Sequence, residues 1–221
     1  SKVVVSSRKL DPCEATAAEI NEACGEERAI AIACNIGYKE QLQALVDETR
    51  QRLGPIDTLI ANAGVNPFYG PMSEIPDEAF DKTMNSNLRS NHWLCQMVAP
   101  DMLAKGRGAI MITASVGAFG PSDTLGTYNI SKMADIALVR NLAMEWGPKG
   151  IRVNALCPGL IRTDFAKALW DNPEAAQRVT EQTPLRRFGE ADDFKGIAVF
   201  VASDASAYVT GQALTVCGGT H

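Results

Sequence analysis

Tyr128 and Lys132 are four residues apart in a segment predicted to be helical, so their side chains share one face of that helix. A tyrosine phenol has a pKa near ~10 and is a poor proton donor or acceptor at neutral pH, but a neighbouring ammonium lowers that pKa. The pair could therefore transfer protons. A solvated helix face is the alternative, because this spacing arises by chance in roughly one chain in six of this composition.

Ser115 strengthens the interpretation as a proton-transfer site. It precedes Tyr128 in the chain and stands at the end of a predicted strand. When a serine at this place is required as well, the chance odds fall to under roughly 1%. Its hydroxyl could hydrogen-bond a substrate oxygen beside the phenol, so the three side chains predict acid–base chemistry at an oxygen atom.

The elements that must position these side chains alternate along the chain. Near-continuous apolar runs, typical of parallel strands covered on both faces, lie at 2–6, 28–33, 56–61, 108–114, 151–156 and 212–217. Helices are predicted at 11–24, 38–53, 76–104, 126–147, 165–181 and 190–202. The alternation predicts one α/β domain, residues 1–221, with a doubly wound parallel sheet.

Ligands of such sheets bind outside the carboxyl ends of the strands. Short segments of small or polar residues follow predicted strands at 6–9, 62–64, 114–117 and 157–160. We therefore expect these segments to converge on one ligand site that includes Ser115.

Composition and charge narrow the classes of partner. The chain has 46% hydrophobic and 21% charged residues, close to the averages of globular domains, and a net charge of −5 that argues against nucleic acid or an anionic membrane. No apolar run approaches the ~18 residues of a membrane helix. The 6 cysteines form no Cys-x-x-Cys pair and only 2 histidines are present, so we expect reduced intracellular thiols and no metal site.

Further motifs accompany the Ser, Tyr and Lys residues in a consistent order. They are Asn62-Ala63-Gly64, Ser115, Tyr128-Asn129-Ile130-Ser131-Lys132 and Pro158-Gly159-Leu160-Ile161-Arg162-Thr163. In this order and spacing they resemble the short-chain dehydrogenase/reductase family over the whole chain. The resemblance implies a Rossmann-type fold and hydride transfer between a nicotinamide cofactor and a carbonyl or alcohol, with a small molecule as substrate.

The same resemblance implies the roles of four catalytic residues. Tyr128 exchanges the proton, Lys132 lowers its pKa and binds the nicotinamide ribose, and Ser115 holds the carbonyl oxygen. Asn87 is expected to bend its helix and to hold a water that relays protons to Lys132. We expect the nearby Asn85 to be an ordinary amide on the helix surface.

The cofactor contacts that the resemblance implies come from several strand ends. They are Asn62, Ala63 and Gly64 behind the adenine ribose, Asn35 near the adenine amino group, and Pro158, Gly159, Ile161 and Thr163 toward the nicotinamide. A simple strand-end turn is the alternative for Asn62-Ala63-Gly64.

The segment Ser7-Arg8-Lys9 bears on the choice of dinucleotide. No carboxylate stands at this strand end to accept a hydrogen bond from a ribose 2′-OH, and an Arg accommodates a 2′-phosphate. We therefore expect NADP(H) rather than NAD(H). Solvation of Arg8 and Lys9 at a helix start is the alternative, although positive charge there is slightly unfavourable.

The sequence predicts the substrate less specifically than it predicts the cofactor. Residues 164–189 are expected to form the family's mobile substrate lid, although their apolar residues could instead be the packed face of an amphipathic helix. Strings at 3–9, 65–70, 128–132 and 186–190 resemble NADP-dependent carbonyl and retinal reductases within the family, which favours a broad carbonyl reductase. An NAD-dependent alcohol dehydrogenase, a 3-oxoacyl carrier-protein reductase and a non-catalytic scaffold remain as alternatives.

Assembly and location are further expectations. Segments 76–104 and 126–147 carry apolar residues on more than one face, which indicates burial on two sides, and the resemblance then implies a homotetramer. The chain ends Gly219-Thr220-His221, unlike the peroxisomal Ser-Lys-Leu type of ending, so we expect a cytoplasmic protein.

One expected feature is missing from the sequence. A Rossmann-type site receives the pyrophosphate at a Gly-rich turn after its first strand, but Gly25 is the first glycine of this chain. We therefore expect that a first strand and its Gly-rich loop, about 30 residues, are missing. The edges of two buried strands would then lose their partners.

Overall fold

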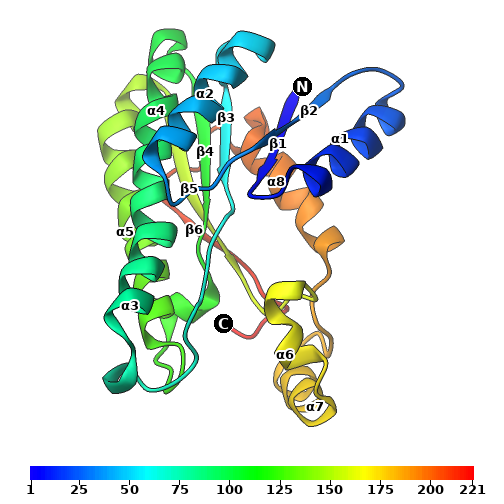
Figure 1. Cartoon of the computed structure of the whole chain (residues 1–221), viewed down its shortest axis with the longest axis vertical. Helices are drawn as coiled ribbons and strands as arrows, with labels where there is room; N and C mark the ends of the chain where they lie inside the picture. The colour runs from blue at the N-terminus through cyan, green and yellow to red at the C-terminus, as the bar shows by residue number, and fades with distance from the viewer.

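Strands and helices alternate along the chain in the computed structural model, which describes residues 1–167 and 170–221 (Figure 1). The strands are β1 (Val3–Ser7), β2 (Ala29–Ala33), β3 (Thr58–Ala61), β4 (Gly108–Thr113), β5 (Ile151–Pro158) and β6 (Ala213–Val216). The α-helices are α1 (Leu10–Cys24), α2 (Lys39–Leu53), α3 (Asp77–Met84), α4 (Ser90–Lys105), α5 (Gly126–Trp146), α6 (Lys167–Trp170), α7 (Pro173–Gln182) and α8 (Lys195–Ala202). The predicted α/β order is confirmed.

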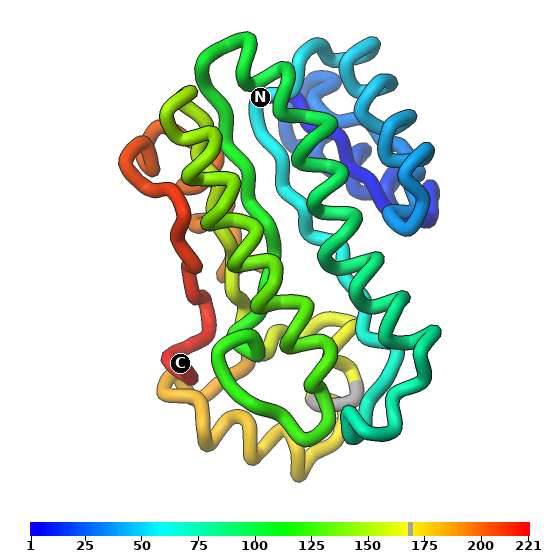
Figure 2. Tube along the Cα trace, turned by 90° about the vertical axis from the view of Figure 1, so that its left-hand side faces the viewer, coloured from blue at the N-terminus to red at the C-terminus, as the bar shows by residue number. Residues whose placement is uncertain are grey.

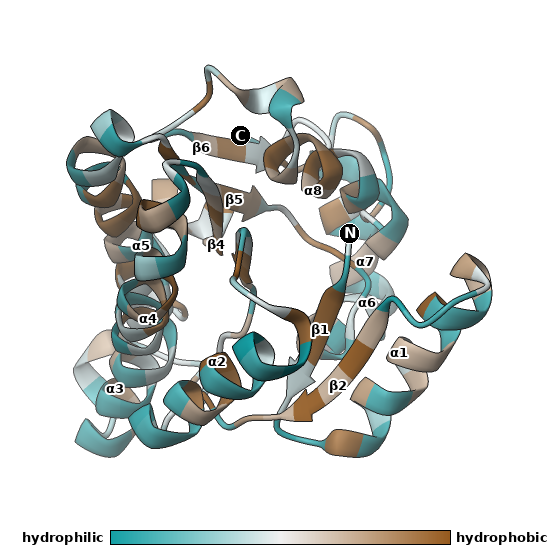
Figure 3. Ribbon diagram, turned by 90° about the horizontal axis from the view of Figure 1, so that it is seen from above, coloured by the Kyte–Doolittle hydropathy of each residue, from teal (hydrophilic) through white to brown (hydrophobic). Residues whose placement is uncertain are grey.

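All strand pairs are parallel, and they form two sheets instead of one continuous sheet. β1 pairs with β2, and the other sheet has the order β3-β4-β5-β6. Figure 3 shows β1 and β2 set apart from β4, β5 and β6. Within the described residues, β1, β2, β3 and β6 each have a single neighbouring strand, so each carries an edge without a strand partner.

Helices cover both faces of the four-stranded sheet. α4 and α5 pack on one face and α8 on the other, while α1 packs on the β1–β2 pair and α2 lies against α4 (Figures 1 and 2). In β4, Ile110 and Ile112 belong to the core under α4 and α5, whereas Met111 packs with Val201 of α8 on the opposite face. Each fully buried side chain of this kind contributes about 1.5–3 kcal/mol. Burial on both faces explains why β4 is a continuous apolar run.

Two predicted helices are interrupted. The expected helix 76–104 is divided into α3 and α4 by a π-helical turn, Asn85–Arg89, and such turns are frequent at functional sites. The expected helix 165–181 becomes a 3₁₀ turn, Asp164–Ala166, followed by α6 and α7. A new helix starts at Pro173, because the Asn172 side chain accepts hydrogen bonds from the next free amides and proline suits the first helical position.

None of the described helices combines the length and the apolar character needed to cross a membrane.

Candidate active site

The carboxyl ends of neighbouring strands lie together within the four-stranded sheet. In Figure 1 these ends are directed toward the lower half of the molecule, where α6, α7 and the C-terminus lie. The Thr113 hydroxyl at the end of β4 donates to Asn62 Oδ1, just beyond β3, over 3.0 Å. The Gly159 amide, after β5, donates to the Val216 carbonyl of β6 over 3.0 Å. These bonds fix the strand ends relative to one another.

Lys132 reaches from α5 to the end of β4. Its side chain is only 3% exposed, and its Nζ donates to the Thr113 carbonyl over 2.7 Å. Nζ also lies 5.9 Å from the centroid of the Tyr128 ring, so the predicted shared helix face is present. The buried ammonium therefore lies close to the phenol.

The pKa of Tyr128 is raised from its ordinary value near 10, whereas the effect of Lys132 alone would lower it. Burial is the main cause, because it disfavours the charged phenolate. Interaction with the Ser115 side chain acts in the lowering direction, and the negative charge of Asp135 raises the pKa further. Tyr128 is thus a protonated phenol at neutral pH, which suits a proton donor.

Ser115 has an extended backbone (φ −168°) and starts a 3₁₀ turn, Val116–Phe119, directly after β4. Its Oγ accepts a hydrogen bond from the Gly117 amide over 3.1 Å, which fixes the rotamer of the side chain. A hydroxyl that accepts this bond keeps its own hydrogen to donate. Ser115 can therefore donate to a substrate oxygen next to Tyr128.

Asn87 lies in the π-helical turn and is fully buried. Its Oδ1 accepts from the Val65 amide over 2.8 Å, and its Nδ2 donates to the Val65 carbonyl over 2.9 Å and to Ser131 Oγ over 3.0 Å. A Cβ added to Gly64 would lie 3.4 Å from Lys132 Nζ and 3.5 Å from Asn87 Oδ1, so both side chains border this glycine.

Asn85 lies on the outer side of the π-helical turn. It lines a groove with Leu88, His92 and Leu138 on the surface of α4 and α5. The π-helical turn thus separates the two amides, one toward the strand ends and one toward the outside.

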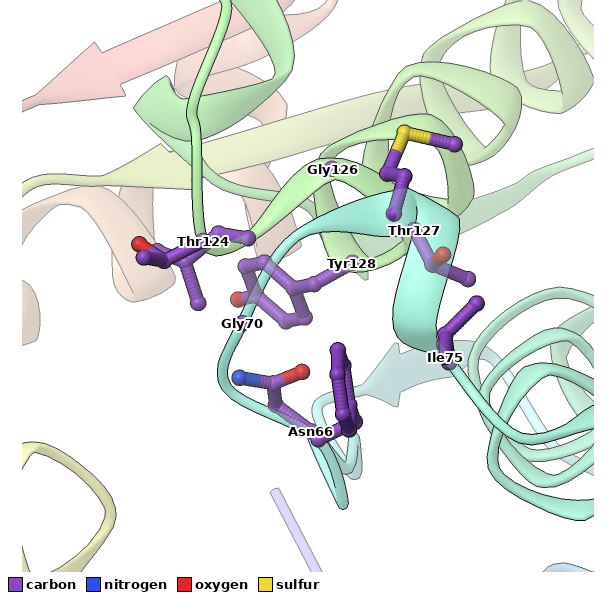
Figure 4. A pocket seen from close by; sticks show the side chains of 10 residues that line it. Asn66, Gly70, Ile75, Thr124, Gly126, Thr127 and Tyr128 are labelled. Carbon is purple, nitrogen blue, oxygen red and sulfur yellow. The ribbon is translucent and has the colours of Figure 1, made fainter.

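A small, shallow hollow borders Tyr128. Its wall comes from residues between Asn66 and Ile75 and from residues 124–128, and Figure 4 shows the Tyr128 ring between these two segments. Phe165, from the 3₁₀ turn after Thr163, has its ring centroid 6.1 Å from that of Tyr128. Aromatic and small polar side chains therefore surround the phenol, as in many sites for small molecules.

The residues expected near the nicotinamide follow β5. A Cβ on Gly159 would lie 2.8 Å from Cys217 Cα, so a larger residue does not fit there. Ile161 forms a parallel bridge with Gly189, and Thr163 is the N-cap of the turn Asp164–Ala166. Pro158 ends β5 itself. Gly159 therefore allows the segment after β5 to approach the segment after β6 closely.

The residues expected near the adenine end follow β1, β2 and β3. Ser7 Oγ accepts from the Lys9 amide over 3.3 Å, and Arg8 and Lys9 are exposed and make no ion pair within the described part of the chain. Asn35 Oδ1 accepts from the Gly37 amide over 3.1 Å, and Ala63 is exposed.

The segment Ser7–Lys9 and Gly25 bear on the adenine end of the expected cofactor contacts. No hydrogen bond between described residues links Ser7, Arg8 or Lys9 to the Tyr128 group. Gly25, with φ 68°, caps the end of α1 and is not a phosphate-binding turn. The expected adenine-end contacts are thus divided between the two sheets, with Ser7, Arg8, Lys9 and Asn35 after β1 and β2, and Asn62, Ala63 and Gly64 after β3 in the four-stranded sheet.

Asp135 and Asn91 are functional candidates that sequence reasoning missed. Asp135 is fully buried and its Oδ2 lies 3.3 Å from Lys132 Nζ, while Asn91 Nδ2 donates to Asp135 Oδ1 over 3.0 Å. The sequence did contain a signal for Asp135, because an Asp three residues after Lys132 shares the same helix face.

Comparisons with known proteins agree with this geometry. A family model described as Enoyl-(Acyl carrier protein) reductase matches residues 1–221. Dehydrogenase/reductase SDR family member 4 from Homo sapiens is 38% identical over 219 residues, which cover 99% of this chain and 78% of that protein.

Solved structures are similar over the whole fold. A gluconate 5-dehydrogenase from Burkholderia cenocepacia, in complex with NADP and tartrate, has a TM-score of 0.93 and 30% identity, covering 100% of this chain and 85% of that one. A 7α-hydroxysteroid dehydrogenase, complexed with NADH and 7-oxo glycochenodeoxycholic acid, has a TM-score of 0.93 and 37% identity, covering 99% and 84%. With the family model and these relatives in agreement, the chain belongs to the short-chain dehydrogenase/reductase family of NAD(P)-dependent oxidoreductases.

Proposed function

We propose that this protein reduces carbonyl compounds to alcohols with NADPH. The observation that carries the proposal is the placement of a half-buried, protonated phenol, Tyr128, beside the hydroxyl donor Ser115 and a small hollow that opens next to the phenol. Ser115 directly follows β4, at the carboxyl ends of the strands where ligands of such sheets bind, and Tyr128 comes from the first turn of α5.

Each residue of the proposed active site has a separate role in this reaction. A bound nicotinamide supplies the hydride. Ser115 and Tyr128 hold the carbonyl oxygen, and Tyr128 donates its proton to that oxygen as negative charge develops there. Lys132 provides positive charge beside the phenolate that forms. Asn87 braces the loop at Val65 through its two backbone bonds, and a water near Asn87 and Lys132 could return a proton to Tyr128.

The choice of NADP(H) rests on Arg8 and Lys9. Both are exposed directly after β1, and neither is paired with a carboxylate in the described residues, so both are available to a 2′-phosphate. The gluconate 5-dehydrogenase in complex with NADP supports this choice, while the hydroxysteroid dehydrogenase complexed with NADH makes NAD(H) the comparison that a test must include.

Residues 164–189 are the proposed substrate lid. The segment leaves and rejoins the body at one point, because Ile161 pairs with Gly189 and the Arg162 amide donates to the Gly189 carbonyl over 2.9 Å. Phe165 is the part of the segment that lies next to Tyr128. Contact with the reacting end of a substrate is therefore assigned to Phe165.

A homotetramer and a cytoplasmic location complete the proposal. The open groove at the π-helical turn and α5 is mainly apolar, with Met84, Leu88 and Leu138 in its lining, which supports contact with a second copy. All 6 cysteines are free thiols, as suits a reducing compartment.

The test compares binding and turnover with both cofactors. Fluorescence titration should show NADPH binding more tightly than NADH, and Arg8→Ala should weaken NADPH binding roughly tenfold with little effect on NADH. Arg28→Ala is the matched control, because Arg28 is a half-exposed arginine whose partner is Glu26. A panel of ketones, aldehydes and acyl thioesters then identifies the substrate class. Failure to bind either nucleotide, or turnover of acyl thioesters alone, would contradict the proposal.

A further inference from the structure

Asp135 is a buried carboxylate that the mechanism above does not use. It is fully buried on α5, and its Oδ2 lies 3.3 Å from Lys132 Nζ. Its other oxygen accepts from Asn91 Nδ2 of α4 over 3.0 Å. A buried ion is costly unless it is paired and hydrogen-bonded, so this carboxylate depends on the Lys132 ammonium.

The carboxylate is held rigidly in relation to the catalytic residues. Asn91 donates from the same amide nitrogen to the carbonyl of Asn87, and Asn87 in turn bonds Ser131. On its other side, Lys132 Nζ is held by the Thr113 carbonyl over 2.7 Å. The position of the ammonium is thus set by one charged and one neutral acceptor, neither of which is Tyr128.

The titratable groups that face Asp135 come from three elements. They are Lys132 and Tyr128 on α5, Cys95 on α4 and Cys157 on β5. Burial, with a further contribution from Asp135, raises the pKa of Cys95 to about 12 and that of Cys157 to about 11. Both thiols are therefore neutral at physiological pH, and the charges that act on Tyr128 from this cluster are those of Lys132 and Asp135.

We infer that Asp135 is a positioning residue that holds the Lys132 ammonium and offsets its charge, so that the Tyr128 phenol gives up its proton less readily and the site favours reduction over oxidation. In reduction, the hydride joins the carbonyl carbon, the proton of the Tyr128 hydroxyl joins the carbonyl oxygen, and solvent reprotonates the phenolate. Oxidation of an alcohol needs the phenolate at the start, and Asp135 makes that form scarce. The preference for reduction over oxidation rests on the proposed function. The effect of Asp135 on the pKa of Tyr128 does not.

Absorbance titration of tyrosinate tests the effect on the proton directly. The Tyr128 signal is the difference between each protein and the same protein carrying Tyr128→Phe. In Asp135→Asn the pKa of Tyr128 should fall by about one pH unit, the size expected for unit charges several ångströms apart in a partly polar interior. Alcohol oxidation below that pKa should then rise up to about tenfold. Asp135→Glu, which keeps the charge, should resemble wild type.

Asp47→Asn is the matched control for the change in net charge, because Asp47 lies on the exposed face of α2 beside Arg50. It should leave the Tyr128 titration unchanged. Coincident Tyr128 titrations in wild type and Asp135→Asn, or an equal shift in Asp47→Asn, would overturn the inference.

A second measurement covers the case in which Asp135→Asn does not fold. In wild-type protein with ¹³C-labelled tyrosine, the Tyr128 ring resonance should respond as Asp135 titrates, and a resonance that is unchanged until the phenol itself ionises would overturn the inference. Neither titration requires turnover. An inactive protein would therefore refute the proposed function alone, and coincident titrations would refute the role of Asp135 alone.

Discussion

The ring of Phe165 lies 6.1 Å from the ring of Tyr128, with the two planes inclined by 39°. This distance is typical of interacting aromatic pairs. The two residues come from different parts of the fold, one from α5 and one from the turn that opens the segment 164–189. Phe165 is 61% exposed, so its outer face is open to a ligand while its inner side approaches the phenol.

Phe165→Ala should therefore weaken the binding of apolar carbonyl substrates. Loss of the ring removes about 1 kcal/mol or more of apolar contact, so KM should rise roughly three- to tenfold while NADPH affinity stays near wild type. Steady-state kinetics with a small and a bulky ketone measure the effect. Leu185→Ala is the matched control, because Leu185 belongs to the same segment and is 63% exposed. Equal kinetics in both variants would argue against Phe165 as a substrate contact.

Asn87→Ala should destabilise the protein strongly, whereas Asn85→Ala should not. The first change leaves the amide and carbonyl of Val65 without their partner and removes the bond to Ser131, which is expected to lower the free energy of unfolding by about 2–4 kcal/mol. Asn85 lines an open groove, so its loss should change that free energy by about 0.5 kcal/mol or less. Urea denaturation of both variants measures the difference. Similar values would contradict the bracing role of Asn87.

The stability of the protein should depend on pH through Asp135. Burial is the main cause that raises the pKa of this carboxyl to about 6 from its ordinary 3.8, against the lowering effect of Lys132. At a pH between these two values, Asp135 is ionised in the unfolded chain but still protonated in the folded protein. The free energy of unfolding of wild type should therefore fall, relative to that of Asp135→Asn, as pH rises from about 4 to about 6. A shift of about two units corresponds to about 3 kcal/mol at most.

Urea denaturation of wild type and Asp135→Asn at a series of pH values measures this dependence. Asp47→Asn serves as the comparison, since its exposed side chain should keep a constant offset from wild type over the same range. A constant offset for Asp135→Asn as well would show that the carboxyl titrates near its ordinary value.

Local pattern was sufficient to predict the strands. β4 lies within one residue of the predicted run, because its side chains are apolar on both faces and Gly108 marks its start. Ser115 was likewise predicted at the end of this strand. Features of this kind depend on neighbouring residues, which the sequence displays directly.

Features that depend on distant contacts could not be predicted in the same way. The π-helical turn is stabilised where Asn87 reaches Val65 and Ser131. The family resemblance led us to expect a bend at Asn87, but no helical periodicity reveals these partners. The amphipathic pattern across 165–181 concealed the start signal at Asn172. The upward shift of the Tyr128 pKa reflects burial, which becomes visible only once α5 is packed against the sheet.

Loss of the Tyr128 hydroxyl tests the central claim most directly. The measurement is the consumption of NADPH with a ketone substrate by wild type and by Tyr128→Phe, together with the Kd of each protein for NADPH. The account predicts turnover by wild type, a fall in kcat of at least about a hundredfold in the variant, and an NADPH Kd within about twofold of wild type. Turnover by Tyr128→Phe within a few-fold of wild type would contradict the account.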